Sequence, residues 1–202
     1  VRKGRVRMKL NLPTKLTVLR LLLIPFCMAA IIAPIFPGDV IWRIVAVAIF
    51  ALTSITDMLD GMIARKYNLV TTLGKFLDPL ADKMLIIGVL IAVMLRYAED
   101  ATFCTVLGIS LFVIVLREMS VTLLRMMAAS KDGIVIAAAW LGKCKTVTQM
   151  AAVIVMLIEP VSFISQYTHL ALSYILIAAM TFMTVWSGIS YFKAYLPVLK
   201  ED

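Results

Sequence analysis

Long apolar runs separated by short polar connections dominate this chain. Six runs are candidates for helices that cross a hydrocarbon core roughly 30 Å thick. They cover residues 16–36, 40–57, 79–97, 103–128, 146–160 and 169–192. Stretches such as MLIIGVLIAVML do not alternate polar and apolar positions, so helices are favoured over a closed barrel. The pattern predicts an all-α integral membrane protein with six transmembrane helices.

The composition supports this interpretation. Hydrophobic residues make up 62% of the chain, whereas soluble globular domains contain roughly 45–50%. The mean hydropathy is +1.00. Six spans leave only short connections, so no separate soluble domain is expected. The predicted organisation is a basic N-terminal arm over residues 1–15, followed by one membrane domain over residues 16–202.

The positions of Lys and Arg predict the orientation. They gather in the N-terminal arm, in the connections after the second and fourth spans, and at the C-terminus, whereas the alternate connections hold only Arg43 and Arg96. Positive charge marks the cytoplasmic side, so both termini are expected to be cytoplasmic, in a multi-pass protein of the cytoplasmic (inner) membrane. The net charge of +8 fits attraction to anionic membrane lipids better than binding of nucleic acid, which is not expected as a partner.

A cluster of aspartates interrupts the apolar pattern. A third of the 12 acidic residues, namely Asp57, Asp60, Asp78 and Asp82, lie between positions 57 and 82. The first two end one span and the last two open the next, with spacings that place each pair on one helix face. We expect Gly61 to let the chain turn after the first pair. If the two helices are neighbours, the four carboxylates converge at the cytoplasmic surface.

Converging carboxylates repel one another strongly unless their pKa values rise or a cation neutralises them. Oxygen ligands select hard divalent ions, so Mg²⁺ or Mn²⁺ is the expected cofactor, and four carboxylates suffice for two ions. A structural alternative exists for each pair. Asp78 before Pro79 is typical of a helix N-cap followed by a first-turn proline, and Asp60 with Gly61 is typical of a helix end.

The segment also carries a spaced motif. It reads D-x2-D-G-x2-A-R-x8-G-x3-D-x3-D from residue 57 to residue 82. This pattern resembles the signature of the CDP-alcohol phosphotransferase family, with each fixed position filled at the family's spacing. The resemblance implies transfer of a phosphatidyl or similar group from a CDP-linked donor to an alcohol, with release of CMP.

The resemblance also implies roles for individual residues. Asp57, Asp60, Asp78 and Asp82 would bind metal, and Asp82 would also act as the catalytic base. The residues implied to contact the CDP donor are Gly61, Ala64, Arg65 and Gly74, joined by Asn11 and Thr14 at the start of the first span. Small residues admit the nucleotide closely, and the Arg65 guanidinium matches phosphate.

The acceptor has to be inferred from outside this motif. The segments NLPTKLTVLR, LREMSVTLLR and GKCKTVTQ resemble those of bacterial family members whose acceptor is sn-glycerol 3-phosphate, with CDP-diacylglycerol as donor. Independently, a charge inside a membrane span is a functional candidate by default. The cations expected to bind an acceptor phosphate are Arg117, Arg125, Lys143 and Lys145.

These cations also have structural explanations. Arg117 can pair with the adjacent Glu118, the other three can serve as topology determinants or lipid contacts, and Arg20 can extend its side chain to the membrane surface. Trp42, Trp140, Trp186 and Tyr191 are expected to pack against lipid or anchor the protein at the membrane interface.

Two alternative functions and one expectation about assembly remain. The acceptor can instead be phosphatidylglycerol, an inositol phosphate or serine. A cation-coupled transporter is a different class, but it predicts carboxylates near the membrane midplane rather than at one surface. Family resemblance suggests a homodimer.

Overall fold

The computed structural model describes the backbone of residues 12–33, 39–66, 72–132, 140–160 and 168–199. Side chains are described for residues 14–33, 40–56, 77, 79–127, 140–160 and 168–195. The regular elements of the described backbone are α-helices, as predicted. They are α1 (Leu12–Ile32), α2 (Asp39–Lys66), α3 (Thr72–Arg96), α4 (Ala101–Asp132), α5 (Trp140–Ile158) and α7 (Ala171–Leu199).

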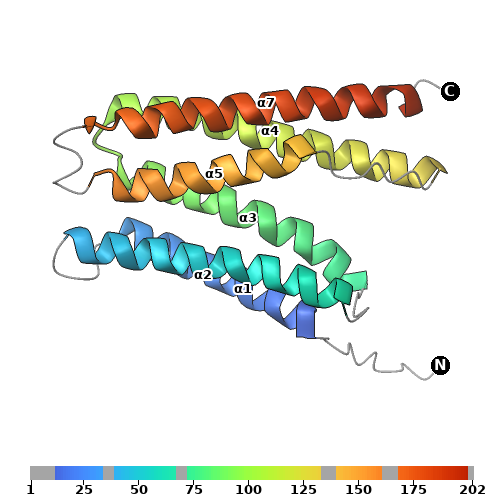
Figure 1. Ribbon diagram of the computed structural model, residues 1–202, viewed down its shortest axis with the longest axis horizontal. Coiled ribbons are helices and arrows are strands. Elements are labelled where there is room, and N and C mark those ends of the chain that lie inside the picture. The colour runs from blue at the N-terminus through green and yellow to red at the C-terminus, as the bar shows by residue number, and fades with distance from the viewer. Residues whose placement is uncertain (1–11, 34–38, 67–71, 133–139, 161–167, 200–202) are drawn as a thin grey trace, which may run out of the picture.

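Successive helices run in alternate directions through one bundle (Figure 1). The first residues of α1, α3 and α5 therefore lie at the same end as the last residues of α2, α4 and α7. We call this the site end and the opposite one the far end. The segment from residue 57 to residue 82 lies at the site end, because α2 finishes there and α3 starts there.

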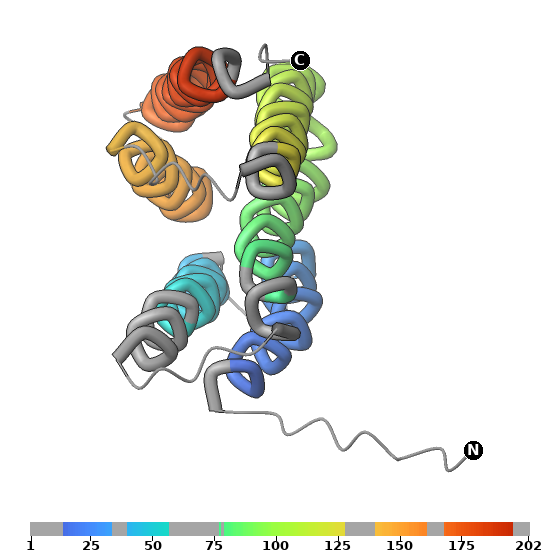
Figure 2. Tube along the Cα trace, turned by 90° about the vertical axis from the view of Figure 1, so that its right-hand side faces the viewer, coloured from blue at the N-terminus to red at the C-terminus, as the bar shows by residue number. Residues whose placement is uncertain are grey.

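The bundle contains two groups of three helices. Helix α1 packs chiefly against α2 and α3, while α7 packs chiefly against α4 and α5. Contacts of α3 with α4 and α5, and of α2 with α5, join the groups, and Figure 2 shows the helices nearly end-on. All six helices contribute buried apolar side chains to one core, including Phe50, Leu90, Phe103 and Met156.

Within the described residues, four helices contain segments long and apolar enough to cross a membrane: Thr14–Ile32, Ala101–Met127, Trp140–Ile158 and Ala171–Tyr195. The apolar part of α2, Val40–Thr56, is shorter. Large apolar side chains such as Phe26, Phe112 and Ile175 are exposed on the outside of the bundle. Such an outer surface is unfavourable in water but suits lipid. The chain is therefore a multi-pass membrane protein.

Polar groups at the far end bind the ends of helices. Arg43 Nη1 donates a hydrogen bond to the Leu157 carbonyl at 3.2 Å, and the Tyr97 hydroxyl donates to the Met156 carbonyl at 2.9 Å. Both carbonyls belong to the last turn of α5, which has no helical N–H to accept from. Arg43 thus has a structural role. The distribution of Lys and Arg along the sequence did not indicate this role.

Two aromatic residues lie elsewhere than predicted. Trp42 is buried in the bundle, where the Arg96 guanidinium lies 4.7 Å from its ring centroid, and Tyr191 is buried too. Their assignment as lipid or interfacial residues was wrong, because each ring is buried and packs against an arginine of another helix. Trp140 and Trp186 are exposed, as expected of residues that face lipid.

Candidate functional site

The two helices that carry the aspartates are longer than the sequence suggested. Helix α2 continues through Gly61 to Lys66, and α3 begins at Thr72 and includes Pro79 in its interior. The expected turn at Gly61 is therefore wrong, and so is the structural alternative that made Asp78 a helix N-cap. Asp57 and Asp60 lie about one turn apart within α2, and Asp78 and Asp82 about one turn apart within α3.

Only part of the motif can be placed at the level of side chains. Asn11 lies outside the described residues. For seven further predicted residues the structure describes the backbone but not the side chain: Asp57, Asp60, Gly61, Ala64, Arg65, Gly74 and Asp78. Asp82 is the one motif aspartate with a described side chain, and it is half-buried. The geometry of the site is therefore built outward from Asp82.

Asp82 lines a small polar cavity between three helices. The cavity has a volume of about 10 Å³, roughly enough for one water molecule. Its charged lining residues are Asp82 and Lys83 from α3, Glu118 from α4 and Lys145 from α5. Thr146 and Gln149 of α5 complete the polar part. Acidic and basic groups from three helices thus meet beside the predicted catalytic base.

Glu118 connects the cations near this cavity. Its Oε1 accepts hydrogen bonds from Arg117 Nη1 at 2.8 Å and from Lys145 Nζ at 2.5 Å. The three side chains are each about nine-tenths buried. Charge-assisted hydrogen bonds of this kind are among the stronger ones in proteins, and burial reduces their screening by solvent.

Helix α7 holds the other side of Arg117. Arg117 Nη2 donates to the Ser187 hydroxyl at 2.6 Å, and the guanidinium carbon lies 5.3 Å from the centroid of the Tyr191 ring. A Cβ added to Gly188 would lie 3.0 Å from Arg117 Cγ. Arg117 is therefore fixed by its charged head and by its aliphatic stem.

Further polar contacts surround the cavity. Lys83 Nζ donates to the Thr122 hydroxyl, which in turn donates to the Glu118 carbonyl at 2.7 Å. Gln149 Nε2 donates to the Thr184 hydroxyl at 3.4 Å. These contacts tie α3 to α4 and α5 to α7 near the cavity.

The structure brings together some of the predicted acceptor-binding residues and separates others. Arg117 and Lys145 meet at Glu118, whereas Arg125 and Lys143 have exposed side chains. The predicted Arg117–Glu118 pair is confirmed. It coexists with a contact from Lys145 that adjacency in sequence does not indicate.

Helix α1 supplies a buried polar stripe. Thr14, Thr17 and Arg20 are buried in its first half, and its buried face becomes apolar at Ile24 and Cys27. Arg20 is fully buried, so the expectation that it extends to the membrane surface was wrong. The stripe lies in the part of α1 nearest the site end.

Sequence reasoning missed several residues of this arrangement. Glu118 was noted only as a partner of Arg117, and Ser187 and Gly188 were not singled out. The available signals were an acid inside an apolar run and a Ser-Gly step inside an apolar helix, where small residues let helices approach closely.

The donor atoms at this end fit a hard divalent ion. Asp82 offers carboxylate oxygens, and the described lining of its cavity contains neither His nor Cys. Among the described side chains no three His, Cys, Asp or Glu residues gather as a metal site. That search does not include Asp57, Asp60 and Asp78, because their side chains lie outside the described ones.

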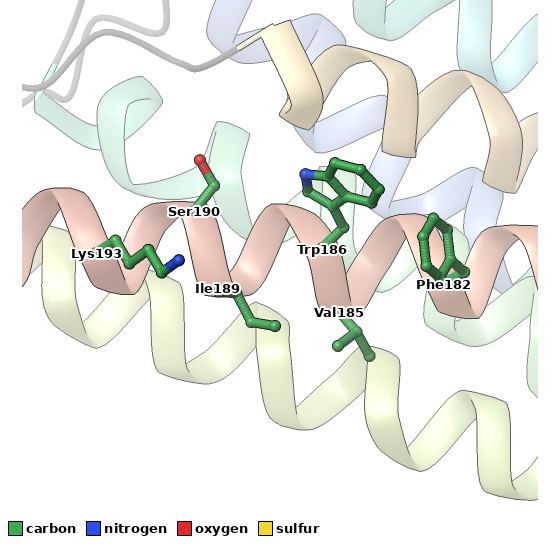
Figure 3. Close-up of a pocket in the computed structure, with 6 residues that line it drawn as sticks. All are labelled: Phe182, Val185, Trp186, Ile189, Ser190 and Lys193. Atoms are coloured by element: carbon green, nitrogen blue, oxygen red, sulfur yellow. The ribbon is translucent and has the colours of Figure 1, made fainter.

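A larger groove lies on the outer surface of α7 and has a volume of about 460 Å³. Figure 3 shows the six residues that line it, namely Phe182, Val185, Trp186, Ile189, Ser190 and Lys193. Its lining is mainly apolar and includes none of the residues around Asp82. Its position and composition suit lipid contact rather than phosphoryl transfer.

Comparison with known proteins identifies similar sequences. The profile of the family described as CDP-alcohol phosphatidyltransferase matches residues 10–186. Three similar relatives are each named CDP-diacylglycerol–glycerol-3-phosphate 3-phosphatidyltransferase. The Bacillus subtilis relative is 36% identical over 200 residues, covering 95% of this chain and 98% of the relative. The Rickettsia bellii relative is 37% identical, covering 91% and 94%, and that of Haemophilus influenzae is 34% identical, covering 92% and 94%.

Proposed function

Because this chain belongs to the CDP-alcohol phosphatidyltransferase family, we propose that it transfers the phosphatidyl group of CDP-diacylglycerol to sn-glycerol 3-phosphate. The products are phosphatidylglycerophosphate and CMP. Relatives named for this donor and this acceptor match nearly the full length of the chain. The observation in the structure that carries the proposal is the buried pair of cations, Arg117 and Lys145, held beside the cavity of Asp82.

The proposed reaction is a single displacement. A hydroxyl oxygen of the acceptor attacks the phosphorus that carries the diacylglycerol, and the bond from that phosphorus to the bridging oxygen of CMP breaks. Asp82 takes the proton of the attacking hydroxyl, and CMP leaves with the bridging oxygen and its electron pair. Asp82 suits this role because it lines the same cavity as Lys145, which is proposed below to bind the acceptor's phosphate.

Asp57, Asp60, Asp78 and Asp82 would hold the divalent ions, and we propose two ions of Mg²⁺ or Mn²⁺. When bound, the ions would neutralise the diphosphate of the donor. The described part of the site supports oxygen ligation, because Asp82 offers a carboxylate and the described lining of its cavity contains neither His nor Cys.

The CDP part of the donor is proposed to contact residues of α2, α3 and the start of the chain. Arg65 would pair with the diphosphate, since a guanidinium matches phosphate oxygens. The remaining contacts are assigned to Gly61, Ala64, Gly74, Asn11 and Thr14. The burial of Thr14 at the site-end half of α1 agrees with this assignment.

Arg117 and Lys145 are proposed to bind the phosphate of the acceptor. A guanidinium has five N–H donors and an ammonium has three, and the described contacts occupy two of the former and one of the latter. Donors therefore remain for an anion. Arg125 and Lys143, which are exposed, are proposed to attract the acceptor electrostatically.

The orientation follows from the same proposal. Lys and Arg concentrate in the segments next to the site end, so we propose that this end faces the cytoplasm and that the membrane is the cytoplasmic one. Both substrates are phosphorylated compounds that would reach the site from that side. A homodimer is proposed on family resemblance alone.

An acceptor panel tests the function. Purified protein in lipid nanodiscs is incubated with CDP-diacylglycerol, Mg²⁺ and, separately, sn-glycerol 3-phosphate, phosphatidylglycerol, inositol phosphate or serine. We expect a lipid product and equimolar CMP with sn-glycerol 3-phosphate only. Turnover with another acceptor but not with this one would contradict the acceptor assignment. Release of CMP when every acceptor is omitted would contradict the whole proposal. So would the absence of CMP release with all four acceptors.

A further inference from the structure

Glu118 is a buried acid to which the proposed reaction assigns no role. It lies on α4, one residue after Arg117, and its Oε1 holds Arg117 and Lys145 at once. We propose that Glu118, with Ser187 and Gly188 of α7, positions these two cations as a preformed site for the acceptor's phosphate. The inference rests on the proposed function, since it assigns these cations to the acceptor.

Electrostatics explains why the two cations need a shared acid. Arg117 and Lys145 come from different helices, and their side chains are about nine-tenths buried. Two positive charges close together in a medium of low dielectric constant repel one another far more than they do in water. A single carboxylate oxygen accepting from both offsets this repulsion and sets the distance between them.

The described hydrogen bonds of the Arg117 guanidinium occupy only some of its N–H donors. Nη1 donates to Glu118 and Nη2 to Ser187, on opposite sides of the fork. Nε is buried and has no hydrogen-bond acceptor among the described residues. The Nε atoms of Arg20 and Arg43 share this property, so the inference rests on the Nη contacts and on the remaining N–H groups of the fork.

Helix α7 fixes the stem as well as the head. The Cα of Gly188 faces the Arg117 side chain so closely that an added Cβ would lie 3.0 Å from Cγ. Any larger residue at position 188 would displace the stem and, through it, the guanidinium. Ser187, the preceding residue, supplies the hydrogen bond to the head. Adjacent positions of α7 therefore determine where the Arg117 charge lies.

The consequence is a division between positioning and binding. A phosphate bound by Arg117 and Lys145 would meet donors already arranged, so less free energy is lost in ordering them on binding. Glu118, Ser187 and Gly188 would act through Arg117 and Lys145 and contact no substrate. Their loss should weaken binding of the phosphorylated acceptor and leave the CDP-lipid donor unaffected.

The test measures KM separately for the two substrates. We expect Glu118→Gln and Ser187→Ala to raise the KM for sn-glycerol 3-phosphate, about tenfold and about threefold respectively, with the KM for CDP-diacylglycerol within twofold of wild type. Glu118→Asp should recover part of the loss. The matched control is Ser110→Ala, which removes a different hydrogen bond between α4 and α7, donated by Thr181 at 2.9 Å, and should change neither KM.

A second readout does not depend on turnover. Inorganic phosphate should raise the melting temperature of wild type and of Ser110→Ala, but raise that of Glu118→Gln and Gly188→Ala much less. An unchanged acceptor KM together with an unchanged phosphate effect in Glu118→Gln would overturn the inference. Wild type could fail to use sn-glycerol 3-phosphate while phosphate still raised its melting temperature more than that of Glu118→Gln. That result would contradict the proposed acceptor and support the positioning of the two cations as an anion site.

Discussion

The two ends of the bundle use buried polar residues in different ways. At the far end, Arg43 and Tyr97 donate to main-chain carbonyls of α5. At the site end, Arg117, Glu118 and Lys145 bind one another across two helices. The first arrangement joins side chain to backbone, and the second joins side chain to side chain.

This difference separates charges with a structural role from those proposed to bind substrate. A side chain that caps a helix supplies a partner to a backbone group that otherwise has none, and the geometry of the helix dictates its position. The described side-chain contacts of Glu118 join side chains of α4 and α5 and satisfy no helix end. In this membrane protein the partner of a buried arginine therefore tells more about its role than its burial does.

The far end also contains an acid with a capping role. Glu159 accepts hydrogen bonds from the backbone N–H groups of Leu172 and Ser173, at 3.0 and 2.6 Å, and from the Ser173 hydroxyl. These N–H groups belong to the first turn of α7, where a negative charge is favourable. Glu118 and Glu159 are thus both largely buried acids. Glu118 binds cations, whereas Glu159 binds the first turn of a helix.

The largest expected effect comes from removing the proposed base. Asp82→Asn should lower kcat by a factor on the order of 10² to 10⁴, the range that general-base catalysis contributes. The melting temperature should stay close to that of wild type, because the side chains of Asp and Asn have nearly the same volume. CMP release and a thermal melt measure the two quantities. Turnover near that of wild type would exclude Asp82 as the base.

Arg117→Ala is expected to have the next largest effect on activity. It removes a proposed phosphate ligand and leaves Glu118 with one cation, so kcat/KM for sn-glycerol 3-phosphate should fall by about tenfold to a hundredfold. Arg117→Lys should recover little, because an ammonium cannot reach Glu118 and Ser187 together as the fork does. An acceptor titration at saturating donor gives the values. Wild-type kinetics in Arg117→Ala would assign this arginine a structural role only.

Arg43→Ala is the matched change at the far end. It removes the donor to the Leu157 carbonyl and should lower the free energy of unfolding by about 1–3 kcal/mol. Kinetic constants should remain within twofold of wild type, because Arg43 lies at the opposite end from Asp82. Denaturation in detergent and the same acceptor titration test both statements. A large loss of acceptor affinity in this variant would contradict the division between the two ends.

The smallest effect is expected at Glu159, and it depends on pH. Burial acts to raise the pKa of the Glu159 carboxyl, but hydrogen bonds from Ser173 and from the backbone of Leu172 outweigh it and hold the pKa below its ordinary value of 4.5. A lowered carboxyl pKa stabilises the fold above the ordinary value, and this contribution is lost as the pH falls through the folded pKa. Glu159→Gln should therefore lower the melting temperature at pH 7 by more than at pH 4. An equal loss at both values would show that the charge is not involved.

The sequence predicted the helices well and several of their ends poorly. The described ends that lie furthest from the predicted limits are the end of α2 at Lys66, the start of α3 at Thr72, the start of α5 at Trp140 and the end of α7 at Leu199. Apolar runs identified all six described helices because each buries an apolar face or meets lipid. Gly61 was expected to turn the chain and Pro79 to lie in the first turn of a helix, yet both lie in helix interiors. A single glycine costs a helix about 1 kcal/mol and an interior proline about 3 kcal/mol, and packing of a long helix in a bundle can outweigh either.

The site was predicted in part for a similar reason. Charge singled out Arg117 inside one predicted span and Lys145 at the start of another, and the structure brings both to Glu118. Their binding of phosphate stays a prediction. Glu118 was interpreted as a local partner of its neighbour, since its second contact comes from α5 and is set by the packing of α4 against other helices. The position of Gly188 opposite the Arg117 stem likewise exists only in the folded bundle.

The most direct test follows radiolabelled sn-glycerol 3-phosphate into lipid, with CDP-diacylglycerol and wild-type protein in nanodiscs. The account predicts labelled phosphatidylglycerophosphate and one CMP per labelled lipid, loss of both on chelation of divalent ions, and recovery with Mg²⁺ or Mn²⁺. Label that enters lipid at full rate in the presence of the chelator, or CMP that forms without the acceptor, would contradict it.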